Sequence, residues 1–143
     1  MKKIVSILLA LIMGCTVFCS CGANPKCEYD AALEAMAENE EITVYIAEDE
    51  KEYKLDGAEI STMLEGKWEK SDKPDNFDKI VAFTIGTQYE ICFFNEGGAI
   101  VYCGYADVLQ SDRQYYKCEL DKSLEDVCQY VRDNGELFQR EED

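Results

Sequence analysis

The feature that most constrains the fold is a series of short segments between residues 42 and 120, separated by charged or glycine-rich turns. In the first segment, Ile42–Ala47, the apolar residues Ile42, Val44 and Ile46 alternate with more polar ones. Alternation with a period of two residues predicts a strand that buries one face. We predict five further strands, at Glu52–Leu55, Lys79–Ile85, Gln88–Phe94, Ala99–Tyr105 and Arg113–Leu120.

Three other segments carry helical signals. Tyr29–Ala37 has apolar residues near one helical face, and Asp56–Gly66 has an apolar stripe behind a capping signal at Asp56. Gly66 is expected to end this second helix in a left-handed conformation. The third helix is predicted to begin at Ser123, to end at residues 134–135, and to bury a stripe made of Leu124, Val127, Cys128 and Val131.

The order of these elements predicts the fold class. Residues 42–55 form a hairpin, and the last four strands follow one another like an antiparallel meander. Between the two groups, a helix and a charged loop at Glu69–Asp78 follow the hairpin. The sequence therefore predicts one small α+β domain over residues 29–140, with a mostly antiparallel sheet and helices packed on one face.

The N-terminal segment differs from the rest of the chain. Lys2 and Lys3 precede an uncharged, mostly apolar run from Ile4 to Phe18. This run of 15 residues is shorter than the roughly 20 that a membrane-spanning helix needs, and it has the length of a signal-peptide core. The alternative is an anchor helix that is retained. In both cases the domain lies outside the cytoplasm.

The end of the apolar run, Cys19-Ser20-Cys21-Gly22, resembles the lipobox of bacterial lipoproteins. Ser20 and Gly22 fit the positions on either side of the lipidated cysteine, whereas Phe18 and Cys19 depart from the pattern. The resemblance implies a signal peptide at residues 1–20, lipidation of Cys21 and a tether at residues 21–28. Cys15 is the competing lipidation site. The layout behind the box also resembles small uncharacterised lipoproteins of Firmicutes, a likeness that brings no activity with it.

The domain after residue 20 is strongly acidic. It holds all 30 Asp and Glu residues and all but two of the 14 Lys and Arg residues. Nucleic acid is therefore excluded as a partner, because phosphate binding needs clustered basic residues. Anionic lipids would repel this surface, so attachment to the membrane depends on the lipid. The acidity indicates either solubility through self-repulsion or a basic or metal-bearing partner.

Five cysteines follow Cys21, so at least one of them is unpaired. Cys92 and Cys103 flank the turn at residues 95–98 and would face each other if Gly97 and Gly98 form the loop, but not if the loop lies one residue earlier. A Cys118–Cys128 disulfide is a second alternative. Without a pairing, Cys92 and Cys128 are expected to be buried as small hydrophobic residues.

No group of residues indicates an enzyme, a metal site or a cofactor. The chain has no histidine, so neither an activated cysteine nucleophile nor a Cys/His zinc site is expected. No phosphate-binding or nucleophile-elbow motif occurs. The densest acidic clusters are Glu48–Glu50 and the group Asp72, Asp75 and Asp78. The second lacks the spacing and the central glycine of an EF-hand loop, so a solvated loop is expected there and loose calcium binding is the alternative.

Tyrosines gather in the last predicted strands, at Tyr102, Tyr105, Tyr115 and Tyr116. Rings on the sheet face away from the helices would form a contiguous recognition surface. The alternative is that tyrosine is simply a favoured strand residue. We therefore expect a lipid-anchored extracytoplasmic binding module that meets a protein, peptide or glycan through its sheet face or an open edge. The second hypothesis is a structural, regulatory or inhibitor-like component of an envelope complex.

Overall fold

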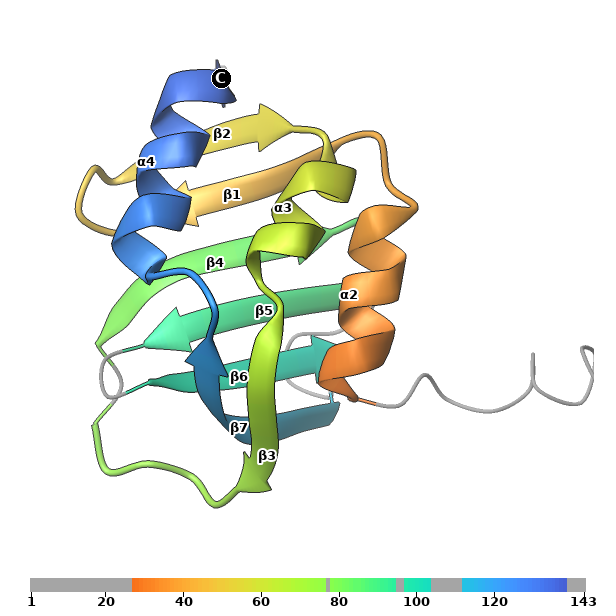
Figure 1. Cartoon of the computed structure of the whole chain (residues 1–143), viewed down its shortest axis with the longest axis vertical. Coiled ribbons are helices and arrows are strands. Elements are labelled where there is room, and N and C mark those ends of the chain that lie inside the picture. The colour runs from red at the N-terminus through yellow and green to blue at the C-terminus, as the bar shows by residue number, and fades with distance from the viewer. Residues whose placement is uncertain (1–26, 77, 95–96, 104–111, 139–143) are drawn as a thin grey trace, which may run out of the picture.

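The computed structural model describes residues 27–76, 78–94, 97–103 and 112–138. Within these ranges the chain forms one strongly twisted antiparallel sheet with three helices on the same face (Figure 1). The α+β class expected from the sequence, with helices on one face of an antiparallel sheet, is confirmed. The elements, in chain order, are α2 (Tyr29–Ala37), β1 (Ile42–Ile46), β2 (Lys51–Leu55), α3 (Gly57–Met63), β3 (Gly66–Ser71), β4 (Lys79–Ile85), β5 (Tyr89–Phe94), β6 (Gly98–Cys103), β7 (Asp112–Leu120), α4 (Leu124–Asn134) and β8 (Glu136–Phe138).

The eight described strands have the spatial order β3-β7-β6-β5-β4-β1-β2-β8. The predicted meander is the central block β4–β7, in which each strand pairs with the next along the chain. The predicted hairpin is β1–β2, and it joins the block because β1 pairs with β4. The strands β3 and β8 form the two edges of the sheet, where β3 pairs with β7 and β8 pairs with β2.

The core lies between the sheet and the helices. Along β4, β5 and β6 the odd-numbered residues face the helices, as Phe83, Ile91 and Val101 show by being fully buried. On α4 the predicted stripe is confirmed, since Val127 and Val131 are fully buried and Leu124 packs against the core. Ser123 caps this helix by accepting a hydrogen bond from the Asp126 N–H.

The charged loop expected after Trp68 begins later than the sequence indicated. Residues 66–71 form β3 and pair with β7 over six residues. The prediction failed because an edge strand with mostly exposed polar residues has no continuous apolar pattern. Gly66 does not end the helix, which stops at Met63. A Cβ atom at Gly66 would lie 2.4 Å from the Glu119 carbonyl oxygen, so glycine allows β3 and β7 to approach.

The turn between β5 and β6 also differs from both predicted registers. Phe94 pairs with Gly98, so three residues join the strands, and Gly97 adopts a left-handed conformation with φ of 72°. Cys92 consequently faces Ile100, not Cys103. In the described part of the chain, no helix is long and apolar enough to cross a bilayer.

Candidate functional site

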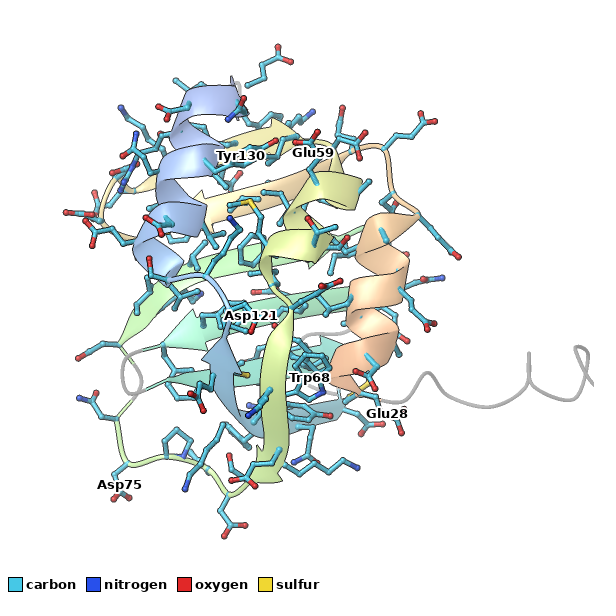
Figure 2. The ribbon with its side chains drawn as sticks, in the orientation of Figure 1. Glu28, Glu59, Trp68, Asp75, Asp121 and Tyr130 are labelled. Atoms are coloured by element: carbon cyan, nitrogen blue, oxygen red, sulfur yellow. A yellow bond between two sulfur atoms is a disulfide. The ribbon has the colours of Figure 1, made fainter. Side chains whose placement is uncertain are left out.

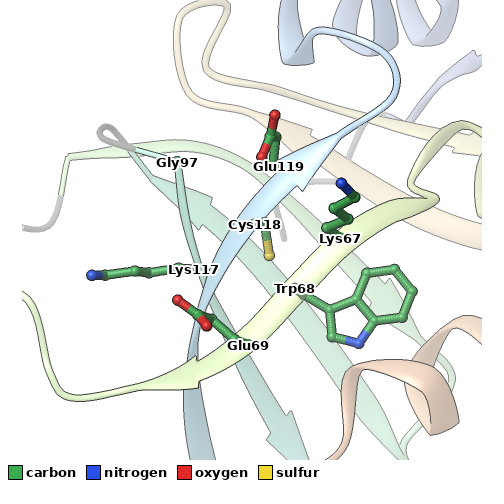
Figure 3. A pocket seen from close by; sticks show the side chains of 7 residues that line it. All are labelled: Lys67, Trp68, Glu69, Gly97, Lys117, Cys118 and Glu119. Atoms are coloured by element: carbon green, nitrogen blue, oxygen red, sulfur yellow. The ribbon is translucent and has the colours of Figure 1, made fainter.

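β3, one of the two strands that the sequence did not predict, borders several hollows of the described surface. One hollow of about 380 Å³ lies along β3 and β7 and is lined in part by Lys67, Trp68 and Cys118 (Figure 3). A second, of about 340 Å³, continues from Glu69 to Pro74 and includes Phe94. A third, of about 460 Å³, lies between β3 and α2. The surroundings of β3 are therefore the candidate site.

The hollow along β3 and β7 has a balanced charge. In the strand register Lys67 lies opposite Glu119, and Glu69 lies opposite Lys117. Facing residues of opposite sign favour the pairing of two strands. The attachment of the edge strand β3 to β7 is therefore enough to explain the charges of these four side chains.

The hollow between β3 and α2 is different, and we call it the acidic groove. Its seven lining residues are Asp30, Leu33, Glu34, Glu65, Gly66, Trp68 and Asp121. Four of the seven are acidic and none is basic. Leu33 is buried and Trp68 is half-buried, so an apolar base lies beneath an acidic rim. Figure 2 shows Trp68 between β3 and the start of α2, with Asp121 and Glu28 on either side of it.

Trp68 is held by the first residue of α2. Its ring packs against Tyr29 with 4.4 Å between centroids. Tyr29 is almost fully buried, and its hydroxyl donates a hydrogen bond of 2.8 Å to the Leu64 carbonyl oxygen. Burial raises the pKa of the Tyr29 hydroxyl well above its usual value, so this group stays a neutral donor. The indole therefore has a fixed position at the base of the acidic groove.

A disulfide joins the start of the described chain to the sheet. Cys27 is bonded to Cys103 at the end of β6, so the register-dependent Cys92–Cys103 alternative is wrong. Cys92 lies on the sheet face away from the helices, whereas Cys103 belongs to the core between sheet and helices. The bonded partner, Cys27, immediately precedes α2 on that core side. Sequence spacing gave no signal for a contact across 76 residues.

Of the four tyrosines of the expected recognition surface, Tyr116 does not lie on the outer face. Tyr116 is buried in the core, where its hydroxyl donates to the Cys27 carbonyl oxygen at 2.8 Å and accepts from the Tyr29 N–H. It therefore does not belong to an outer patch. Tyr105 lies outside the described residues.

Tyr102 and Tyr115 remain on the outer face of adjacent strands. Tyr102 pairs with Arg113, whose guanidinium lies 5.6 Å from the ring centroid, and Tyr115 is two residues further along β7. Both rings are half-buried. Burial raises the pKa of Tyr102, with a smaller contribution from nearby Cys92. The outer face therefore presents two partly covered rings, not an open aromatic surface.

The remaining described cysteines are unpaired, so the alternative Cys118–Cys128 disulfide is also wrong. Burial raises the pKa of Cys92 to about 11 and that of Cys118 to about 12. Both thiols therefore stay protonated at neutral pH and are poor nucleophiles. Cys92 and Cys128 are buried, as expected for small hydrophobic residues.

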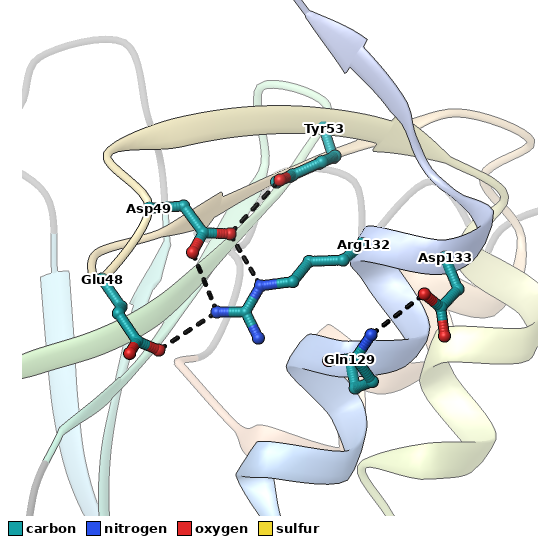
Figure 4. Close-up of polar contacts among 6 residues, drawn as sticks. All are labelled: Glu48, Asp49, Tyr53, Gln129, Arg132 and Asp133. Atoms are coloured by element: carbon teal, nitrogen blue, oxygen red, sulfur yellow. Dashed lines mark hydrogen bonds and ion pairs between the residues drawn. The ribbon is translucent and has the colours of Figure 1, made fainter.

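One predicted acidic cluster has a structural partner. Arg132 on α4 donates from Nε to Asp49 Oδ2 at 2.7 Å and from Nη2 to Glu48 Oε2 at 3.1 Å (Figure 4). The Tyr53 hydroxyl also donates to Asp49. These carboxylates hold the β1–β2 turn against α4. Among the described residues, no group of three or more Cys, Asp and Glu side chains is arranged to hold a metal ion.

The acidic groove was not predicted, and only part of it had a sequence signal. Trp68 is the only tryptophan in the chain, and a single large aromatic beside exposed charges is a common recognition residue. The carboxylates come from α2, from the residue before β3 and from the residue after β7. A comparison with protein-family models, with curated proteins and with solved structures found no match to this chain.

Proposed function

We propose that the chain is a lipid-anchored extracytoplasmic binding module whose ligand site is centred on β3. The observation that carries this proposal is the acidic groove, where half-buried Trp68 belongs to β3, an edge strand of the sheet. Aromatic residues that are held in place offer large contact area at a low entropic cost. The Tyr102 and Tyr115 face is the competing site.

The proposed location has two supports. The first is the lipobox-like segment ending at Cys21. The second is the Cys27–Cys103 disulfide, because such bonds persist mainly in oxidising compartments outside the cytoplasm. Five residues lie between Cys21 and Cys27, so the two α-carbons can be at most about 20 Å apart in a fully extended chain. A lipid on Cys21 would thus keep the start of α2, and the groove beside it, close to the bilayer.

Replacement of Cys21 tests the anchor. We expect Cys21→Ser to leave the signal uncut and to remove the lipid, while Cys15→Ser leaves both processing and lipidation intact. Mass spectrometry of the N-terminal peptide, in a host with the lipidation enzymes, measures both. An unmodified mature N-terminus in the parent protein would contradict the anchor.

Photocrosslinking in native membranes tests the position of the site. A benzophenone amino acid at Glu65 should give discrete adducts, because Glu65 is exposed and lines the acidic groove. The same group at Tyr102 probes the competing face, and at Asp75 it provides a background from a distant loop (Figure 2). Adducts at Tyr102 but not at Glu65 would move the site to the outer face. Adducts at neither position would contradict the binding function.

A further inference from the structure

The outer edge of β3 has no partner strand among the described residues, since β3 is the last strand in the sheet order. In an antiparallel pair, alternate residues turn their N–H and C=O groups away from the partner strand. The Asp121 N–H donates to the Glu65 carbonyl at 3.0 Å, so Glu65 is directed towards β7. The alternation then directs the backbone groups of Gly66, Trp68 and Lys70 towards the open edge.

The hydrogen bonds of the partner strand β7 agree with this orientation of the β3 backbone. Cys118 lies opposite Trp68, and its N–H donates to Gly97 at 2.7 Å, away from β3. Gly66 and Trp68 are also the β3 residues that line the acidic groove. Backbone donors and acceptors that face no strand in the described part of the chain, an apolar base and an acidic rim therefore meet along one side of β3.

From this combination we propose that the acidic groove binds an extended, Lys- or Arg-rich polypeptide segment, which adds to the sheet as a strand beside β3. The proposal rests on the proposed function and names the partner class for the same site. Backbone hydrogen bonds to an open edge supply affinity for any extended segment, and the pockets for alternate side chains supply specificity.

The charge of the groove selects the occupant. Asp30 and Glu34 lie one turn apart on α2, while Glu65 and Asp121 lie on the β3–β7 side. All four carboxylates surround one hollow without a basic residue in its lining. A strand with basic residues at every second position would direct them to one face, where they could meet these carboxylates. An acidic segment would be repelled.

The test uses the mature lipidated protein in a neutral detergent and follows the emission of Trp68, the only tryptophan. The probe is a synthetic peptide in which lysine alternates with threonine. We expect it to shift the emission saturably and to bind more weakly at high salt, because exposed charges are screened. The combined variant Asp30→Asn and Glu34→Gln should weaken binding about tenfold, given the usual size of exposed charge contacts.

Two controls separate charge from strand addition. The variant Glu40→Gln with Asp75→Asn changes the net charge equally, and both positions are exposed and absent from the groove lining; it should bind like the parent protein. The same peptide with alternate backbone nitrogens methylated keeps its lysines but lacks the edge hydrogen-bond donors, and it should lose binding by at least about tenfold.

Each outcome has a distinct meaning. Equal binding of the methylated peptide would overturn strand addition. Equal or tighter binding of a peptide with glutamate in place of lysine would overturn the cationic partner, and the β3 site would stand. Failure of all these peptides, together with specific adducts at Glu65, would overturn the inference while the binding function survives. Failure of the peptides and of the crosslinks would contradict both.

Discussion

At the scale of single residues, tyrosine hydroxyls differ in what they contribute. The Tyr29 hydroxyl bonds a main-chain carbonyl inside the core, where water cannot replace the interaction. The Tyr130 hydroxyl on α4 donates to Glu59 on α3 at the surface, where water can (Figure 2). The hydroxyls of Tyr29 and Tyr130 both donate one hydrogen bond, the first in the core and the second at the surface. Tyr130 can therefore serve as the control for a variant of Tyr29.

Tyr29→Phe should destabilise the domain by about 2 kcal/mol, because it leaves the Leu64 carbonyl oxygen without this buried donor. Tyr130→Phe should leave the free energy of unfolding almost unchanged, because water can replace the lost bond. Urea unfolding followed by circular dichroism measures both. Equal effects of the two variants would mean that Leu64 finds another partner. The Trp68 emission should also shift in Tyr29→Phe if the ring contact loosens.

At the scale of elements, α4 is attached to the sheet in two ways. Val127 and Val131 enter the core, and Arg132 reaches the β1–β2 turn through Asp49 and Glu48. The first attachment is apolar and does not depend on pH. The second depends on the ionisation of a carboxylate, so the two can be separated experimentally.

Val131→Asp should unfold the domain, because it places an unpaired charge at a fully buried position and costs at least about 4 kcal/mol. Gln129→Asp introduces the same residue into the exposed face of the same helix and should cost less than about 1 kcal/mol. Thermal melting distinguishes the two. A Val131→Asp protein with an unchanged melting temperature would show that the stripe is not buried.

The Arg132 attachment predicts a pH dependence. The hydrogen bonds from Arg132 lower the pKa of Asp49, so the folded state favours the ionised form. A lowered folded pKa gives stability that is present above the unfolded pKa, about 3.9, and is lost as the pH falls through the lower folded value. Asp49→Asn should therefore cost about 1 kcal/mol at neutral pH, and this difference should shrink below about pH 4.

Urea unfolding of both proteins across this pH range measures the effect. Glu48→Gln is the control, since its side chain is 84% exposed and it receives one bond from Arg132. It should have a smaller effect at every pH. A constant difference between Asp49→Asn and the parent protein down to strongly acidic pH would contradict the linkage.

At the scale of the whole molecule, the disulfide joins the chain segment nearest the proposed anchor to a central strand. Cys27 lies just before α2, and Cys103 ends β6, which pairs on both sides. A pull on the N-terminus would therefore reach the sheet directly, without first unwinding α2. The Tyr116 hydroxyl adds two hydrogen bonds at the same place, since it donates to the Cys27 carbonyl oxygen and accepts from the Tyr29 N–H.

Removal of this bond should destabilise the protein by about 4 kcal/mol, because the bond closes a loop of 76 residues in the unfolded chain. We expect the variant Cys27→Ser with Cys103→Ser to match the parent protein treated with a reductant, and the reductant to have no effect on the variant. Urea unfolding measures each case. An unchanged midpoint after complete reduction would contradict a stabilising role for the bond.

The local sequence determined most elements of this fold. The alternation of Ile42, Val44 and Ile46, and the apolar stripe behind Ser123, each specify an element through contacts between neighbours in the chain. Because consecutive strands tend to pair, the meander followed from their order as well. The order of the elements, with helices between and after groups of strands, also predicted that the helices pack on one face of the sheet.

The tertiary structure alone decided the edge strand, the cysteine pairing and the candidate site. The polar residues of β3 become a strand only because β7 supplies a partner. A three-residue turn directs Cys92 to the opposite face from Cys103, and this register depends on packing as well as on turn residues. The acidic groove combines residues that lie up to 91 positions apart in the chain, from Asp30 to Asp121. Local patterns contain no information on such contacts, because the folded core brings them together.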